Sequence, residues 1–148
     1  MEARVKQDDF QKLLAAAEVA ATPQHYILDA EGNVVPEFDL HVWAAWMERK
    51  DRKLASDTIE TPKGPRLVST VFLGLDHRFG GGGAPVIFET MTFRPMTGQE
   101  IKARDRLFKS DTGWEWTEDD EFPMERYCSL QEALKGHDEA VAKLRAIK

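Results

Sequence analysis

The chain has 148 residues, of which 42% are hydrophobic and 31% charged, and its formal net charge is −6. This length and composition are typical of a soluble globular protein with a single core. The negative charge disfavours sequence-independent nucleic-acid binding, which needs a cationic surface to displace counterions from phosphates.

Three further features concern the cellular setting. The lone Cys128 has no partner for an internal disulfide. The acidic residues Glu2, Asp8 and Asp9 do not fit a signal peptide. No apolar stretch approaches the roughly 20 residues of a membrane span. The sequence therefore predicts a cytoplasmic protein without a membrane partner.

The first predicted element is an amphipathic helix over residues 8 to 21. Phe10, Leu13 and Leu14 recur at helical spacing, and the alanines nearby add helix propensity. The apolar face suits packing on its own domain, which is the favoured interpretation, or docking to a partner such as a second copy of the chain. We therefore predict a single domain over residues 1 to 148, with residues 1 to 23 as a helical extension.

A hairpin and a helix are predicted next. Residues 25 to 29 and 34 to 36 have strand character, and Gly32 between them permits a tight reversal. Asp39 is a suitable N-cap for an amphipathic helix over residues 40 to 49.

Residues 67 to 93 predict two central strands joined by a glycine-rich loop. Apolar side chains on both faces of these strands indicate a middle position in a sheet. The polar residues 54 to 61 suit an edge strand beside them. The run from Gly80 to Gly83 lies between strands and lacks the Gly-Lys-Ser/Thr ending of a phosphate-binding loop. A flexible tip, or a loop whose backbone approaches a ligand, fits this run better.

Glu89 is unusual because it lies within one of these largely apolar strands. Burying a carboxylate costs several kcal/mol unless the group is paired or protonated. We expect its partner among Arg78, Arg94, Arg126 and His137.

Two charged segments follow. Residues 100 to 108 are interpreted as a strand in which Lys102, Arg104 and Arg106 share one face and form a basic ridge. Residues 111 to 121 form an acidic segment with two tryptophans. An intramolecular charge complement or an exposed loop is the favoured interpretation of this segment, and a recognition loop is the alternative.

The chain is predicted to end with a short strand over residues 124 to 128 and a helix that runs to about residue 146. Ser129 and Glu132 have the spacing of a capping box at the start of that helix. His137 lies on its apolar stripe, where a histidine is more often a core residue than a ligand-binding one. Gly136 costs about 1 kcal/mol relative to alanine in a helix, which indicates that a backbone or a ligand approaches closely.

One set of side chains has the chemistry of a metal or acid-base site: Asp76, His77, Glu89 and His137. Carboxylates and imidazoles suit zinc, manganese or iron, and also suit proton transfer. Asp76 and His77 point to opposite faces unless the strand has already ended there. No established metal-binding or nucleophile motif accompanies the set, and the sequence identifies no cofactor.

Several segments are distinctive when taken together. They are Tyr26-Ile-Leu-Asp29, Val68-Ser-Thr-Val-Phe-Leu-Gly-Leu-Asp-His-Arg-Phe79, Phe88-Glu-Thr-Met91, Arg126-Tyr127 and Gly136-His137. As a set they resemble a family of small uncharacterised phage and prophage proteins, over roughly residues 25 to 145. The resemblance implies an accessory protein in the cytoplasm of the host cell, and it implies neither an activity nor site residues.

We expect an α+β fold, in which an antiparallel sheet of about four to six strands carries the C-terminal helix on one face and additional helices are N-terminal. The favoured function is a binding protein that occupies a host protein or sequesters a small ligand such as a signalling nucleotide. The predicted ligand-binding residues are Asp76, His77, Arg78, Glu89, Arg126 and His137. The alternatives are a small metal-dependent or acid-base hydrolase that uses Asp76, His77, Glu89 and His137, and a protein-interaction module that acts through residues 111 to 121.

Overall fold

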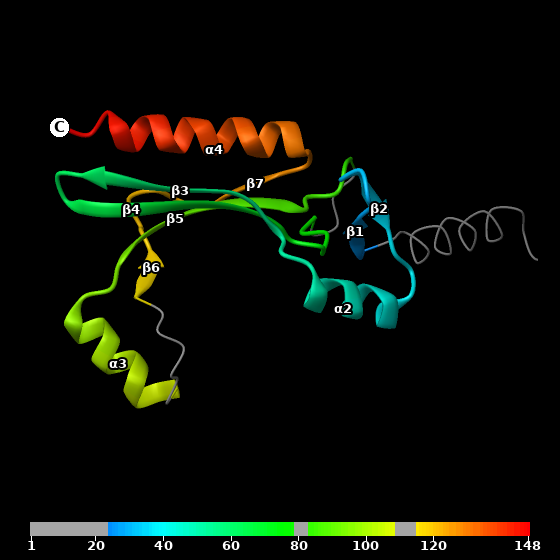
Figure 1. Ribbon diagram of the computed structural model, residues 1–148, viewed down its shortest axis with the longest axis horizontal. Coiled ribbons are helices and arrows are strands. Elements are labelled where there is room, and N and C mark those ends of the chain that lie inside the picture. Colours follow the sequence, from blue (N-terminus) through cyan, green and yellow to red (C-terminus); the bar gives the residue numbers. More distant parts are fainter. Residues whose placement is uncertain (1–23, 79–82, 109–114) are drawn as a thin grey trace, which may run out of the picture. The chain divides into compact units, whose positions relative to one another are not determined.

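The structure is a computed structural model that describes residues 24–78, 83–108 and 115–148 (Figure 1). The helix predicted over residues 8 to 21 and most of the glycine run lie outside these residues. The chain divides into two compact units, residues 1–48 and 49–148, and each is described by itself. The single domain over 1 to 148 stays a prediction. Among the described residues, no helix has both the length and the apolar character needed to cross a membrane.

The first unit contains a hairpin and a helix. Strands β1 (Tyr26–Leu28) and β2 (Val34–Pro36) pair antiparallel. The Asp29 carboxylate accepts the backbone N–H of Asn33 at 2.8 Å across the turn. Helix α2 (Leu40–Arg49) begins after Asp39, whose Oδ1 accepts the backbone N–H of His41 at 2.9 Å. The predicted hairpin, helix and N-cap are therefore confirmed.

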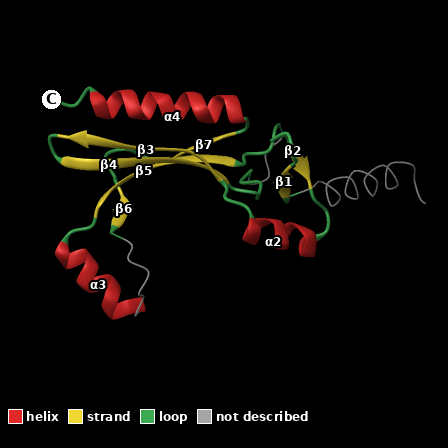
Figure 2. Cartoon of the chain, viewed as in Figure 1, coloured by secondary structure: helices red, strands yellow, loops and turns green. Residues whose placement is uncertain are grey.

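The second unit is built on an antiparallel sheet of five strands (Figures 1 and 2). The strands are β3 (Lys53–Thr61), β4 (Gly64–Phe72), β5 (Phe88–Pro95), β6 (Trp116–Glu118) and β7 (Glu125–Tyr127). Strand β4 lies between β3 and β5, while β6 and β7 pair with the two halves of β5. The predicted edge strand, central strands and final short strand are thus all present.

Helix α4 (Leu130–Arg145) packs on one face of this sheet and confirms the α+β prediction. Every second residue of β4 faces the helix because side chains alternate along a strand. The core between the helix and the strands includes Ile59, Val68, Phe72, Phe88, Ala133, Val141 and Leu144. The predicted N-cap is confirmed, since the Ser129 hydroxyl accepts the backbone N–H of Glu132 at 3.1 Å. The Glu132 carboxylate accepts from the Ser129 hydroxyl at 3.2 Å.

The strand predicted over residues 100 to 108 is wrong, because this segment belongs to helix α3 (Gly98–Phe108). The Thr97 hydroxyl accepts the backbone N–H of Glu100 at 3.2 Å, and the Glu100 carboxylate accepts the backbone N–H of Thr97 at 2.9 Å. These reciprocal bonds form a capping box, which satisfies two amides that have no partner within the helix. The predicted basic ridge along one strand face therefore does not exist.

Candidate functional site

The carboxylate of Glu89 is paired with Arg126, one of the four expected partners. The two residues lie opposite each other on β5 and β7. The Arg126 Nε donates to Glu89 Oε2 at 3.1 Å, and the Glu89 side chain is 11% exposed. The pairing compensates the cost of placing a carboxylate within the sheet.

His137 lies on the other side of the sheet from Glu89. Its ring is 2% exposed beneath α4, with Nδ1 2.8 Å from the Thr70 hydroxyl. Thr70 faces the helix, whereas Val71, which is paired with Glu89, faces away. The sheet therefore separates Glu89 from His137, and the expected contact between them is absent.

Asp76 and Arg78 hold the base of the loop that contains the glycine run. Asp76 accepts the backbone N–H groups of Arg78 and Val86, at 2.9 and 3.0 Å, and the Arg78 Nε at 2.7 Å. The Arg78 guanidinium also donates to the carbonyl of Gly83. Burial raises the pKa of Asp76, but the hydrogen bonds from Arg78 and Val86 outweigh it, so the pKa lies below its usual value. The carboxylate is thus already occupied by contacts within the loop.

The six predicted ligand-binding residues consequently lie in three places: at the base of the loop, on the open face of the sheet and beneath α4. His77 belongs to the first place, where its backbone N–H donates to the carbonyl of Val86 at 2.8 Å. Among the described residues, no three His, Cys, Asp or Glu side chains are grouped as metal ligands would be. The site expected for a hydrolase is therefore not assembled, and binding by the individual residues stays a prediction.

His137 also forms a triad-like arrangement that the sequence did not suggest. Its Nε2 lies 2.7 Å from Asp57 Oδ2, and its Nδ1 contacts the Thr70 hydroxyl. In composition this resembles an acid, a base and a hydroxyl nucleophile. Thr70, however, is completely buried, so no substrate reaches its hydroxyl. The arrangement is a buried polar chain, which continues from Thr70 to Thr90 over 2.6 Å.

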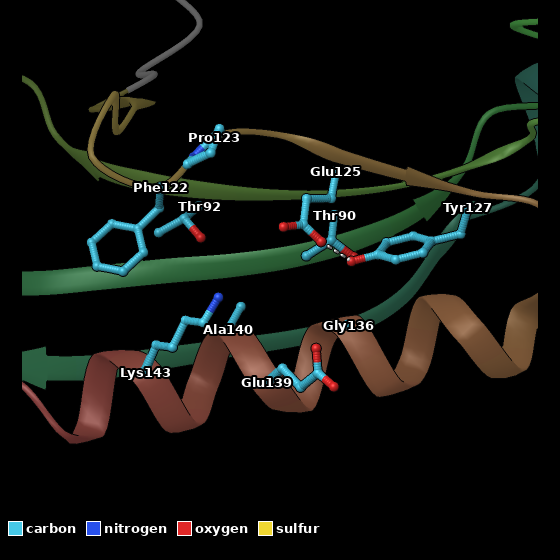
Figure 3. A pocket seen from close by; sticks show the side chains of 10 residues that line it. All are labelled: Thr90, Thr92, Phe122, Pro123, Glu125, Tyr127, Gly136, Glu139, Ala140 and Lys143. Atoms are coloured by element: carbon cyan, nitrogen blue, oxygen red, sulfur yellow. Dashed lines mark hydrogen bonds between the residues drawn. The ribbon is translucent and has the colours of Figure 1, made fainter.

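A small pocket lies at the end of this chain, between α4 and strands β5 and β7 (Figure 3). Its lining consists of Thr90, Thr92, Phe122, Pro123, Glu125, Tyr127, Gly136, Glu139, Ala140 and Lys143. The Tyr127 hydroxyl donates to Glu125 Oε2 at 2.8 Å. The pocket volume of about 50 Å³ accommodates a few water molecules and no larger metabolite.

Tyr127 covers Gly136 in this pocket, which explains the glycine in the helix. A Cβ at Gly136 would overlap the Tyr127 hydroxyl and ring. The close approach predicted from the sequence is therefore made by a side chain. Burial and the hydrogen bond to Glu125 raise the pKa of Tyr127, whereas a hydrogen bond from Thr90 acts in the opposite direction. The phenol thus keeps its proton.

A larger groove occupies the face of the sheet that α4 leaves open. Its volume is about 650 Å³, within the range of small-molecule sites. The apolar and aromatic part of the lining is formed by Leu67, Phe93, Met96 and Trp116, and the charged part by Lys53, Arg104, Glu115 and Glu118. Sequence reasoning missed the groove because α3, which supplies Arg104, was interpreted as a strand.

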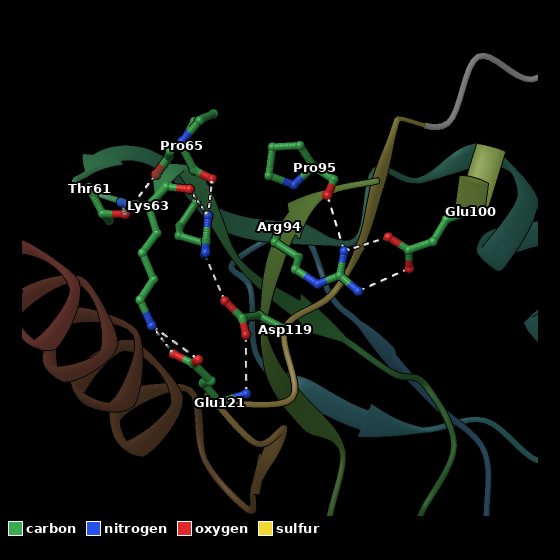
Figure 4. Close-up of polar contacts among 10 residues, drawn as sticks. Thr61, Lys63, Pro65, Arg94, Pro95, Glu100, Asp119 and Glu121 are labelled. Atoms are coloured by element: carbon green, nitrogen blue, oxygen red, sulfur yellow. Dashed lines mark hydrogen bonds and ion pairs between the residues drawn. The ribbon is translucent and has the colours of Figure 1, made fainter. Parts of the chain in front are cut away.

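Ion pairs fix the walls of the groove to the sheet (Figure 4). The Arg94 guanidinium donates to both carboxylate oxygens of Glu100, at 2.7 and 2.9 Å, and so ties the start of α3 to β5. The Arg66 Nε donates to Asp119 at 2.7 Å directly after β6. The side chains of this second pair are only 9% and 4% exposed.

The second pair confirms one of the two favoured interpretations of residues 111 to 121, the intramolecular charge complement, because Asp119 pairs with Arg66 and Glu121 with Lys63. Trp116–Glu118 is a strand of the sheet and Asp119 is buried, so this part of the segment is not an exposed loop. Residues 111 to 114 lie outside the described residues. Glu115, Glu118, Asp120 and Glu121 are exposed, so the recognition-loop alternative stays a prediction.

The contact between Arg94 and Glu100 should persist to unusually low pH. Hydrogen bonds from the Arg94 guanidinium and the Thr97 N–H lower the pKa of Glu100 from 4.5 to about 2. A carboxylate with a lowered pKa stabilises the folded state above its ordinary pKa, and this stabilisation decreases as the pH falls to the folded value. The NMR signal of the Glu100 side-chain carboxyl carbon should therefore titrate with a midpoint of about pH 2.

The variant Glu100→Gln provides the control for this acid titration. It retains the side-chain shape without the carboxylate, so its side-chain amide carbon should not show the same acid transition. A midpoint for Glu100 near its ordinary value of 4.5 would contradict the expected pairing.

Comparisons with known proteins gave no match to a family model, a curated protein or a solved structure. The chemistry of the groove therefore provides the basis for a functional proposal.

Proposed function

We propose that the protein is a non-enzymatic binding protein that holds a small ligand in the groove of its open sheet face. The observation that supports this most strongly is a groove of about 650 Å³ whose lining is aromatic and aliphatic and includes two cations, Lys53 and Arg104, beside two carboxylates, Glu115 and Glu118. Ligand sites commonly combine an apolar lining with a few polar groups that fix orientation. This role agrees with the accessory function that the resemblance to phage proteins implies.

The lining favours a ligand with a flat ring and a negatively charged group. Trp116 and Phe93 offer aromatic surface on which a planar ring stacks. Arg104 and Lys53 supply cations, and Arg104 is held between Asp105, 3.1 Å from its NH2 group, and Met96. An anionic group of the ligand would replace Asp105 as the partner of the Arg104 guanidinium. A nucleotide of the host cell unites both chemical features.

The lining also favours binding over catalysis. Within the described residues, the groove lining contains no histidine or cysteine, and its hydroxyls belong to Ser69 and Thr117. Activation of a hydroxyl nucleophile requires a base within hydrogen-bond reach, and among the described residues neither Ser69 nor Thr117 is hydrogen-bonded to the carboxylates of the lining, Glu115 and Glu118. The one imidazole that contacts threonine, His137, lies on the opposite face of the sheet.

Calorimetric titration with adenine and guanine mononucleotides and cyclic dinucleotides tests the proposal. We expect one of these classes to bind at one site per chain. Arg104→Ala should weaken that binding about tenfold or more, since a charge-assisted hydrogen bond contributes about 1.5 to 3 kcal/mol. Trp116→Leu should weaken it as well by removing the stacking surface.

Arg106→Ala is the matched control, because Arg106 is an exposed arginine on the same helix and does not line the groove. This variant should retain the wild-type affinity. Equal loss in both arginine variants would assign binding to general charge, and no binding of any nucleotide would overturn the proposed ligand class. Turnover of a bound nucleotide would show that the protein is an enzyme.

A further inference from the structure

A continuous polar chain crosses the interface between α4 and the sheet. It begins at Asp57 on the edge strand β3 and passes through the His137 ring to Thr70, with contacts of 2.7 and 2.8 Å. It continues over 2.6 Å to Thr90, which lines the small pocket beside Tyr127. Asp57 is half exposed, whereas the next three members are at least 95% buried. Water therefore has access to the chain at Asp57.

When His137 is neutral, the protons available in this chain determine which group donates and which accepts in each hydrogen bond. Nε2–H donates to the Asp57 carboxylate, because a carboxylate only accepts. Nδ1 then has no proton and accepts from the Thr70 hydroxyl. Since Thr70 has already donated its one proton, Thr90 must donate to Thr70. The lone pairs of Thr90 are then available toward the pocket.

Protonation of His137 reverses the direction of the hydroxyl bonds. Both ring nitrogens now donate, so Thr70 accepts from Nδ1–H and turns its own proton toward Thr90. Thr90 in turn directs its own proton into the pocket, which Tyr127 and Glu125 also line. Tyr127 keeps its proton and donates to Glu125. The Thr90 hydroxyl therefore offers the pocket a hydrogen-bond acceptor when His137 is neutral and a hydrogen-bond donor when His137 is protonated.

We propose that His137 is a proton switch whose charge sets the direction of the Thr70–Thr90 hydrogen bond and thereby the polarity of the pocket beside Tyr127. Histidine is the side chain that ordinarily changes its charge between about pH 5 and 8. The switch works without any movement of the backbone, because only hydroxyl protons rotate. It is independent of the ligand proposed for the groove on the other face of the sheet.

Charged groups face this region from each element packed around it, and α4 itself contributes Glu139 and Lys143 to the pocket wall. Asp57 on β3 is in direct contact, with its Oδ2 2.7 Å from Nε2 of the ring. From β4, the one charged side chain on the helix-facing side is Arg66, which is already paired. Strand β5 contributes the threonine hydroxyls, and β7 contributes Glu125 and Tyr127 at the far end of the chain. Asp57 is thus the half-exposed carboxylate that contacts the buried ring.

NMR of ¹⁵N- and ¹³C-labelled protein tests the switch. The ring nitrogens of His137 should titrate, and the Tyr127 ring carbon that bears the hydroxyl should shift with the same midpoint. Thr90→Val removes the hydroxyl that links the two rings, so His137 should still titrate while the matching Tyr127 shift disappears. Thr90→Ser restores a hydroxyl at the same place and should restore the shared midpoint.

Thr92→Val is the matched control, because Thr92 is a buried threonine on the same strand and the same pocket wall. This variant should retain the coupling, which separates the chain from a general effect of losing a hydroxyl. The proposal is overturned if His137 keeps one charge state from about pH 4 to 9, a range that spans its ordinary pKa. It is also overturned if the Tyr127 shift persists in Thr90→Val, since Glu125 or Glu139 would then be its source.

Discussion

Replacing Asp119 with alanine should lower the free energy of unfolding by about 3 to 5 kcal/mol, the usual cost of breaking a buried ion pair from one side. The Arg66 side chain is 9% exposed, so its guanidinium would stay buried without a counter-charge. The variant also loses the hydrogen bond in which Asp119 accepts the backbone N–H of Glu121 at 3.1 Å. Urea denaturation followed by circular dichroism measures the change.

The neighbouring pair of Lys63 and Glu121 provides a matched control, because Glu121 lies in the same turn as Asp119 (Figure 4). Its side chains are 58% and 61% exposed, with an N–O distance of 3.2 Å. Exposed pairs contribute about 0 to 1 kcal/mol, so Glu121→Ala should change the stability little. If Glu121→Ala and Asp119→Ala lowered the free energy of unfolding by similar amounts, burial would not be what makes the Arg66–Asp119 pair important for stability.

A double replacement distinguishes the contribution of the ion pair from the cost of leaving one charge buried without a partner. Arg66→Met with Asp119→Leu exchanges both charges for apolar groups of comparable size. Such replacements are often neutral or stabilising, since the cost of desolvating two charges disappears. We therefore expect the double variant to recover most of the stability that Asp119→Ala loses.

Local sequence signals were sufficient for much of the fold. The spacing of Ser129 and Glu132 correctly predicted the start of α4, and Asp39 correctly predicted that of α2. The same type of signal is present at Thr97 and Glu100, but the strand over residues 100 to 108 was predicted from the alternating basic residues alone. An alternating charge pattern without alternating apolar residues is weak evidence for a strand, because burial of one face is what fixes strand parity.

The arrangement of the site depended on contacts that leave no local signal. Arg66 and Asp119 are 53 residues apart, and nothing near Asp119 distinguishes it from the acidic residues around it. The position of Glu89 relative to His137 depended on strand parity. A shift of one residue moves a side chain to the other face of a sheet, and Thr90, adjacent to Glu89, is the residue that connects to His137 through Thr70.

Gly136→Ala should destabilise the protein by about 1 to 3 kcal/mol, the usual cost of inserting a methyl group into a packed site. The new Cβ would overlap the Tyr127 hydroxyl and ring, so the tyrosine must leave its place beside Glu125 or α4 must move away from β7. This effect is opposed by the gain in helix propensity, which is about 1 kcal/mol for glycine to alanine. Thermal unfolding of the two proteins measures the net change.

The effect of Gly136→Ala on stability should change from destabilising to stabilising once Tyr127 is removed. In a Tyr127→Ala background, Gly136→Ala meets no ring, and the propensity gain of up to about 1 kcal/mol should then stabilise the helix. Gly98→Ala is the control on α3, because a Cβ there has no atom within 4 Å. If Gly136→Ala destabilised both backgrounds equally, the glycine would be needed for the backbone itself and not for the tyrosine that lies across it.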